Sequence, residues 1–394
     1  MISVVLEKFK SRKVQATAKV VFLVLVVLQA LSMAVKFYTS DGWDHEIYCK
    51  AAAALDKGLD PFIAENIGLK LSYTYPALFL PVYKGLCSSV GNYYVVLNLV
   101  LVAAIIFMLV KYLRVDAIIA FPFVCFGFNS VYSNFQTGNV GLWEACALSL
   151  AMVFCLRGKV WATLFLVPAT FLKIIPGALA LPIGLYQSKK WSSRFLAWGL
   201  FALGGLVLLG MNYWFSPQLF VSFFNQATGK YANQHSPVHE LDSNASNPTV
   251  PLFFKNLATI LSSDHWQILF AVFMVLMIAF SYWIWKKVIR NETDKLYRMC
   301  WSFLVLFLWF PRLKPYSLIL IVIAMLPLLS RMNRRFAFSV IIVSIFHRSL
   351  NGDKANLWAD FLLNNTAIYT LIAVYAFMVV RWAALQRSSE KEGA

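Results

Sequence analysis

Charged residues are scarce in this sequence, and acidic residues are the scarcest of them. Only 13% of the 394 residues are charged, with 18 Asp and Glu against 35 Lys and Arg. Hydrophobic residues make up 60% of the chain, and the mean hydropathy is +0.66. Soluble globular domains do not have this composition. It excludes a soluble domain and predicts an all-α, polytopic membrane protein.

The sequence also lacks the motifs that bind nucleotides or activate a serine nucleophile. It has no glycine-rich phosphate loop, no dinucleotide fingerprint, no cysteine cluster and no Gly-x-Ser-x-Gly elbow. His235 and His239 have a spacing that could suit a metal, but turn-forming residues surround them, so they need not share a face. We therefore expect no cofactor and no metal.

The net charge of +17 comes from short basic clusters between apolar runs. This is the pattern of cytoplasmic loops in membrane proteins, not of a nucleic-acid-binding surface, so no nucleic acid is expected. All clusters fall on one side if about twelve helices begin near residues 18, 92, 115, 139, 160, 176, 191, 266, 297, 315, 335 and 361. Residues 1–394 then form a single integral membrane domain with both termini inside, expected in a bacterial inner (plasma) membrane.

This topology leaves two large external loops, residues 38–92 and 216–265. Within the first loop, residues 73–90 look apolar, but Pro76, Pro81 and Lys84 interrupt them. The uninterrupted stretch is shorter than the roughly 20 residues that a spanning helix needs. We expect a surface or re-entrant helix there.

Five of the acidic residues gather in residues 41–62, directly after the first apolar run. Apolar residues recur at helical spacing across residues 43–55, which predicts an amphipathic helix on the bilayer surface. Asp44 lies at its start. This residue either caps the helix or acts as a catalytic carboxylate, with Asp41 as the nearest rival.

Six cysteines are present, and only Cys49 and Cys87 flank the polar region after the first span. They are the one plausible disulfide pair if that region is extracytoplasmic. Two ordinary thiols are the simpler expectation.

Three basic residues lie at the expected outer ends of helices, although most basic residues are expected on the cytoplasmic side. They are Lys173, Arg312 and Lys314. Lys173 stands beside a Pro-Gly break, where a charge at membrane depth either lines a cavity or snorkels to the interface. Basic residues suit a phosphate leaving group, and a nearby carboxylate suits a general base. This combination indicates sugar transfer from a polyprenyl-phosphate donor on the external face.

Several short motifs follow one another along the chain: Asp44-x-x-x-Tyr48 with Gly58-x-Asp60-Pro61-Phe62, Tyr73-x-Tyr75-Pro76, Gln136-x-Gly138-Asn139, Lys173-x-x-Pro176 and Pro311-Arg312-x-Lys314-x-Tyr316. Together they resemble the polyprenol-phosphate-dependent glycosyltransferases of family 87, membrane enzymes of the GT-C fold that include mycobacterial mannosyltransferases. The resemblance implies that Asp44 is the catalytic aspartate and that the basic residues face the donor phosphate. The expected substrate-binding residues are Asp41, Tyr48, Tyr75, Gln136, Asn139, Lys173, Arg312, Lys314 and Tyr316.

The expected reaction moves a sugar, with mannose favoured, from the polyprenyl-phosphate donor to an extracytoplasmic glycolipid or glycan acceptor. Gln136 and Asn139 cannot form a glycosyl ester, so a single catalytic carboxylate predicts inversion. The expected partners are the donor, the acceptor and membrane lipids. The alternatives are a secondary transporter or lipid flippase, which broken helices also suit, and an oligosaccharide ligase that uses a polyprenyl-diphosphate donor.

Overall fold

The computed structural model describes residues 12–38, 42–87, 93–230, 248–262, 264–346 and 357–392. Every regular element in these ranges is a helix, and these ranges contain no strand. The bilayer core contains no water that could hydrogen-bond the backbone N–H and C=O groups. A helix forms these hydrogen bonds within its own segment. The fold class predicted from composition is therefore confirmed.

Six helical segments of the described chain are long and apolar enough to cross a membrane. Each begins within about six residues of a predicted span start. They are α2 (Arg12–Tyr38), α6 (Tyr93–Lys111), α7 (Ala117–Phe126) continuing through η2 (Gly127–Asn129) into α8 (Ser130–Thr137), α12 (Trp191–Phe215), α15 (Trp266–Ile284) continuing into η5 (Trp285–Ile289), and α20 (Thr366–Glu392).

The other six predicted spans are also helical, but they are shorter. They are α9 (Gly141–Leu156), η3 (Val160–Phe165) with α10 (Leu166–Leu172), α11 (Ile175–Gln187), α16 (Lys295–Trp309), η6 (Pro315–Leu318) with α17 (Ile319–Arg331), and α18 (Arg334–Ile345). Within α17 every side chain from Ile319 to Leu329 is at most 2% exposed, so this helix lies in the centre of the bundle. It packs against α7, α9 and α16.

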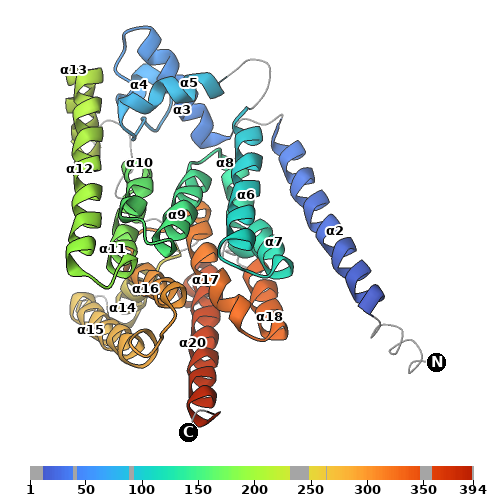
Figure 1. Cartoon of the computed structure of the whole chain (residues 1–394). Coiled ribbons are helices and arrows are strands. Elements are labelled where there is room, and N and C mark those ends of the chain that lie inside the picture. Colours follow the sequence, from blue (N-terminus) through green and yellow to red (C-terminus); the bar gives the residue numbers. More distant parts are fainter. Residues whose placement is uncertain are drawn as a thin grey trace.

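A separate layer covers one end of the bundle (Figure 1). It consists of α3 (Trp43–Asp56), α4 (Ala64–Ile67), η1 (Ala77–Phe79) and α5 (Leu80–Leu86), and α13 (Pro217–Ala227) lies at the same end. The start of α2 and the end of α20 lie toward the opposite end. The helix expected at residues 43–55 is present as α3. Residues 77–86 form only about 15 Å of helix, at 1.5 Å per residue, which agrees with a surface helix.

A disulfide between Cys49 and Cys87 ties α3 to the end of α5, with 5.5 Å between the Cα atoms. The expectation of two free thiols was wrong. The two cysteines are 38 residues apart, and only the packing of α5 against α3 brings them together.

The second large loop, residues 216–265, begins with α13 and continues after the undescribed residues with α14 (Val250–Leu261). His235 and His239 lie outside the described residues. The hydroxyl of Thr249, at the start of α14, donates to the carbonyl of Pro311 at 3.3 Å and so connects this loop to the segment that precedes η6. A short helix, α19 (Leu357–Asn364), precedes α20.

Candidate active site

The start of α3 is pressed against the turn between α8 and α9, and two glycines allow this contact. A Cβ atom on Gly42 would lie 2.6 Å from the carbonyl carbon of Thr137. Gly138 has φ +68°, and a Cβ atom there would lie 2.5 Å from the Cβ of His45. Any larger residue at either position would push the two backbones apart. The glycines therefore place Asp44 next to Asn139.

Asp44 does not cap its helix. The N-cap position is held by Gly42, which makes no side-chain capping bond, and Asp44 lies in the first turn. Its Oδ2 instead accepts a hydrogen bond from Asn139 Nδ2 at 2.7 Å. The capping interpretation of Asp44 is thus wrong. The other described acidic residues of the segment have local structural partners: Glu46 pairs with Lys50 at 2.8 Å, Asp56 with Lys84 at 2.9 Å, and Asp60 accepts from Ser222 at 2.5 Å.

A line of polar contacts continues inward from Asn139. Its Oδ1 accepts a hydrogen bond from Lys173 Nζ at 2.5 Å. The same ammonium lies 3.1 Å from Glu144 Oε1 and 4.1 Å from the ring centroid of Tyr316. Asp44, Asn139, Lys173 and Glu144 form a continuous polar chain, which we call the Asp44 chain.

Lys173 occupies the break between α10 and α11, in an extended conformation with φ −155° and ψ 145°. Pro176 lies at the start of α11, where its missing N–H is not needed. The Lys173 side chain is only 16% exposed. It points to Glu144 and Asn139 instead of snorkelling to the bilayer surface.

Glu144 was not recognised from the sequence. It lies in the first turn of α9 and its side chain is fully buried. A buried carboxylate needs a partner because desolvation disfavours its charge, and Lys173 provides one. The only sequence signal was a single acidic residue within the apolar stretch 139–156.

The segment 311–316 closes the other side of the site. Asn134 Nδ2 donates to the carbonyl of Tyr316 at 2.9 Å, and a Cβ atom on Gly141 would lie 2.6 Å from that same carbonyl oxygen. This close packing brings the segment onto the start of α9. Arg312 is exposed and Lys314 is partly exposed at this position.

Opposing influences act on the carboxylate of Asp44. Burial raises its pKa above the ordinary aspartate value, whereas the hydrogen bond from Asn139, contact with Thr137 and the charges of Lys173 and Lys314 lower it. The raising effect is larger. A carboxylate with a raised pKa is a better proton acceptor once it is ionised.

Aromatic residues of the covering layer form one wall beside Asp44. The hydroxyls of Tyr48 and Tyr75 lie 3.2 Å apart, and the Tyr48 ring stacks on Tyr83 at 4.5 Å between centroids. Burial raises the pKa of both Tyr48 and Tyr75, and the nearby Asp44 charge adds to this. Both hydroxyls therefore stay neutral.

One expected residue is not part of this arrangement. Gln136 is exposed on α8 and has no hydrogen bond to the Asp44 chain. Asp41 lies outside the described residues. Among the described residues, the one group with metal-ligand spacing is His45, Cys49 and Cys87, with ligand atoms within 4.8 Å of one another. Its two sulfurs are bonded to each other, so they are not the thiolates that bind metals.

A helical membrane bundle with a carboxylate, an amide and cations gathered at one end is the framework of an integral membrane enzyme. The family model of glycosyltransferase family 87 matches residues 73–312, and the chain belongs to that family. The protein is therefore a membrane glycosyltransferase. The match contains most of the expected binding residues and begins after Asp44. No match to a curated protein is found for this chain.

Proposed function

We propose that this protein transfers a sugar, with mannose favoured, from a polyprenyl-phosphate donor to an extracytoplasmic glycolipid or glycan acceptor. The observation that carries the proposal is the Asp44 carboxylate, which makes no cap, is held by Asn139 at 2.7 Å and is influenced by the charge of Lys314. Family membership supports the reaction class.

In the proposed reaction, Asp44 accepts the proton of the acceptor hydroxyl as that oxygen attacks the anomeric carbon of the donor sugar. The bond between the anomeric carbon and the phosphate oxygen breaks, and its electron pair leaves with the phosphate. Because the leaving phosphate is already an anion, no general acid is needed. Positioned cations stabilise the charge that develops on it.

Arg312 and Lys314 are the proposed contacts of the donor phosphate. Arg supplies paired donors and Lys supplies a point charge, and both belong to the segment that closes the site. Lys173 has a different position, since Glu144, Asn139 and Tyr316 surround its ammonium. We assign it the role of holding Asn139 toward Asp44 and adding positive charge beside the donor.

Among the described residues, Asp44 is the carboxylate we assign to the sugar site, and this favours a single displacement with inversion. A retaining double displacement needs a nucleophile in addition to the base. Glu144 is fully buried and paired with Lys173, so it has no open side for a sugar. A β-linked polyprenyl-phosphate sugar should therefore give an α-linked product.

The Cys49–Cys87 disulfide supports an extracytoplasmic position for the covering layer. Disulfides form and persist in oxidising compartments and are rare in the cytosol. This disulfide joins α5 to α3, the helix that carries Asp44. A site on that side uses a lipid-linked donor because no nucleotide-sugar pool is present there.

The test is a transfer assay with the purified protein in lipid vesicles. Labelled polyprenyl-phosphate mannose, glucose and arabinose would be compared with mannose on a polyprenyl diphosphate. We expect labelled glycolipid product from a monophosphate donor, and mannose as the best sugar. Transfer from the diphosphate donor alone would instead establish an oligosaccharide ligase. Movement of donor across the bilayer without product would establish a flippase.

A further inference from the structure

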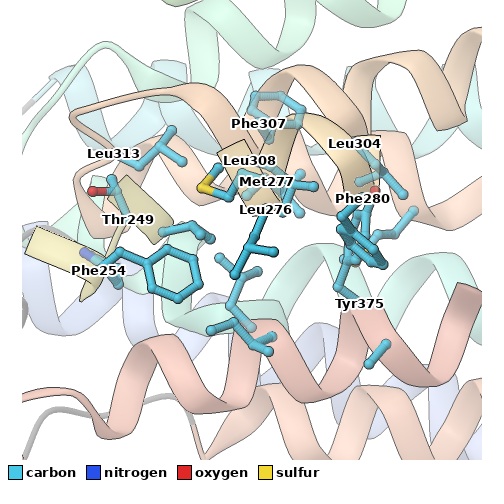
Figure 2. A pocket seen from close by; sticks show the side chains of 17 residues that line it. Thr249, Phe254, Leu276, Met277, Phe280, Leu304, Phe307, Leu308, Leu313 and Tyr375 are labelled. Carbon is cyan, nitrogen blue, oxygen red and sulfur yellow. The ribbon is translucent and has the colours of Figure 1, made fainter. Parts of the chain in front are cut away.

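A cavity of about 250 Å³ lies among α14, α15, α16, α17 and α20 (Figure 2). We call it the apolar pocket. Its walls are almost entirely hydrocarbon; Thr249 and Tyr375 are the two lining residues with hydroxyl groups. Protein interiors are normally close-packed, and an unfilled space of this size is unfavourable. Such a cavity is therefore suited to an apolar ligand.

The apolar pocket extends from the lipid-facing surface into the core. Leu276 on α15 is 58% exposed and Phe280 is 41% exposed, whereas Met277 between them is 6% exposed. Deeper in the wall, Leu304 of α16 and Met325 of α17 are buried. A hydrocarbon chain can thus enter sideways from the bilayer without crossing a polar barrier.

The upper end of the apolar pocket lies at the segment that carries the cations. Leu313 lines the pocket and is buried, and its two neighbours in sequence are Arg312 and Lys314. Thr249, also in the wall, donates its hydroxyl to the carbonyl of Pro311. A phosphate bound by Arg312 and Lys314 would therefore lie close to the buried end of the pocket, where Leu313 forms part of the wall.

We propose that the apolar pocket binds the phosphate-proximal isoprene units of the donor lipid, an inference that rests on the proposed function. A polyprenyl phosphate has one hydrocarbon chain that starts at the phosphate oxygen. A glycerophospholipid instead places a glycerol and two ester carbonyls between phosphate and chain. The pocket wall is poorly suited to those carbonyls, because Thr249 and Tyr375 are its two hydroxyl-bearing residues and the Thr249 hydroxyl donates to Pro311.

The volume of the apolar pocket limits how much of the chain it holds. An engineered cavity of about 150 Å³ holds a benzene molecule. About 250 Å³ therefore holds several isoprenoid carbons, not a whole polyprenyl chain. The rest of the chain extends past Leu276 into the bilayer. The pocket should accordingly distinguish donors by the structure of their first isoprene units and tolerate differences in total length.

Photolabelling tests this placement without any need for sugar transfer. The probe is geranylgeranyl phosphate with a diazirine in its second isoprene unit, added to the full chain in phosphatidylcholine vesicles. We expect labelled peptides that contain Met277 or Met325, and competition by unlabelled polyprenyl phosphate but not by dioleoyl phosphatidic acid. Labelling only of lipid-facing positions, or equal competition by phosphatidic acid, would overturn the proposal.

Matched substitutions locate the chain within the apolar pocket. Ala376→Phe fills the pocket at its exposed rim on α20, and Val380→Phe adds the same ring at a position on α20 that is 70% exposed to lipid. We expect Ala376→Phe to lower labelling and to raise the KM for the donor roughly tenfold, the lower end for a size mismatch in an apolar pocket. Val380→Phe should leave both the labelling and the donor KM at the values of the unaltered protein. Equal labelling of both variants contradicts the proposal.

Failure of this inference can be separated from failure of the proposed function. If no polyprenyl-phosphate sugar supports transfer but the pocket is still labelled, the prenyl site stands and the proposed reaction is wrong. If transfer proceeds while labelling avoids the pocket, the reaction stands and the prenyl site is wrong. Size-exclusion elution and the melting temperature of each variant show whether it is folded.

Discussion

The Asp44 chain and the apolar pocket both border segment 311–316, and they differ in nearly every chemical property. The Asp44 chain consists of charged and amide side chains, and each lies within 3.1 Å of the next. The apolar pocket has almost no polar atom in its wall. The charge of Lys314 lowers the pKa of Asp44, and the neighbouring residue Leu313 lines the pocket.

This difference explains how the fold can handle an amphipathic substrate. Charges at membrane depth are costly and persist where they are paired or serve a function. One such group lies beneath the covering layer, where Asn139 and Lys173 connect Asp44 to Glu144. Segment 311–316 borders both regions, so a donor bound there would have its phosphate beside the polar region and its hydrocarbon in the apolar one.

The largest expected effect comes from Asp44→Asn, which should lower the transfer rate about 10³-fold, within the 10²–10⁴ range typical of general bases. The amide keeps the shape of the side chain but cannot accept the proton. Donor binding in the apolar pocket should be unchanged. Glu46→Gln is the matched control on the same helix, because Glu46 pairs only with Lys50. Near-normal turnover in Asp44→Asn would show that Asp44 is not the general base.

Glu144→Gln should destabilise the fold by about 3–5 kcal/mol, the range for breaking a buried ion pair, because Lys173 keeps its charge without a counter-charge. Thermal unfolding of the purified protein measures this. The double variant Glu144→Gln with Lys173→Met removes both charges and should regain most of the lost stability. A single variant as stable as the unaltered protein would show that the pair contributes nothing.

Arg312→Ala and Lys314→Ala should each weaken donor binding by roughly 1.5–3 kcal/mol, the value for a lost hydrogen bond to a charged group. The donor KM should rise and photolabelling should fall, whereas acceptor binding should not change. Lys84→Ala provides a control, since that lysine pairs with Asp56 on the covering layer. Unchanged donor affinity in both loop variants would place the phosphate elsewhere.

Asn139→Ala should produce the smallest change, a shift in the pH dependence of transfer. Activity requires ionised Asp44, so the rate falls as the pH falls through its raised pKa. The Asn139 hydrogen bond lowers that pKa, and its removal raises the pKa further. The acidic limb of the rate profile should therefore move to higher pH. A shift to lower pH, or none, would show that Asn139 does not act on Asp44.

Local sequence patterns predicted much of the fold and part of the site. Helical spacing indicated α3, and the basic clusters indicated helix starts that the structure contains. The polar turn around Asn139 and the break at Lys173 were both expected at the external side. Each of these features depends on residues close together in the chain, so periodicity and loop charge suffice to find them.

The features that the sequence did not reveal depend on packing between residues that are far apart in the chain. Glu144 pairs with Lys173 only because α9 and α10 are neighbours, and no local pattern marks that contact. Cys49 and Cys87 meet through the packing of α5 on α3. The apolar pocket arises from five helices whose separate sequences are simply hydrophobic. Sequence periodicity identifies apolar faces but does not show where they leave a gap.

The anomeric configuration of the product distinguishes a single displacement from a double displacement, and so decides whether Asp44 acts as a base without a second nucleophile. The measurement is an NMR assignment of the glycosidic linkage made from a donor of known β configuration. We expect an α-linked product, formed by inversion with Asp44 as the base. A β-linked product would require a second nucleophile and would show that the proposed mechanism is wrong.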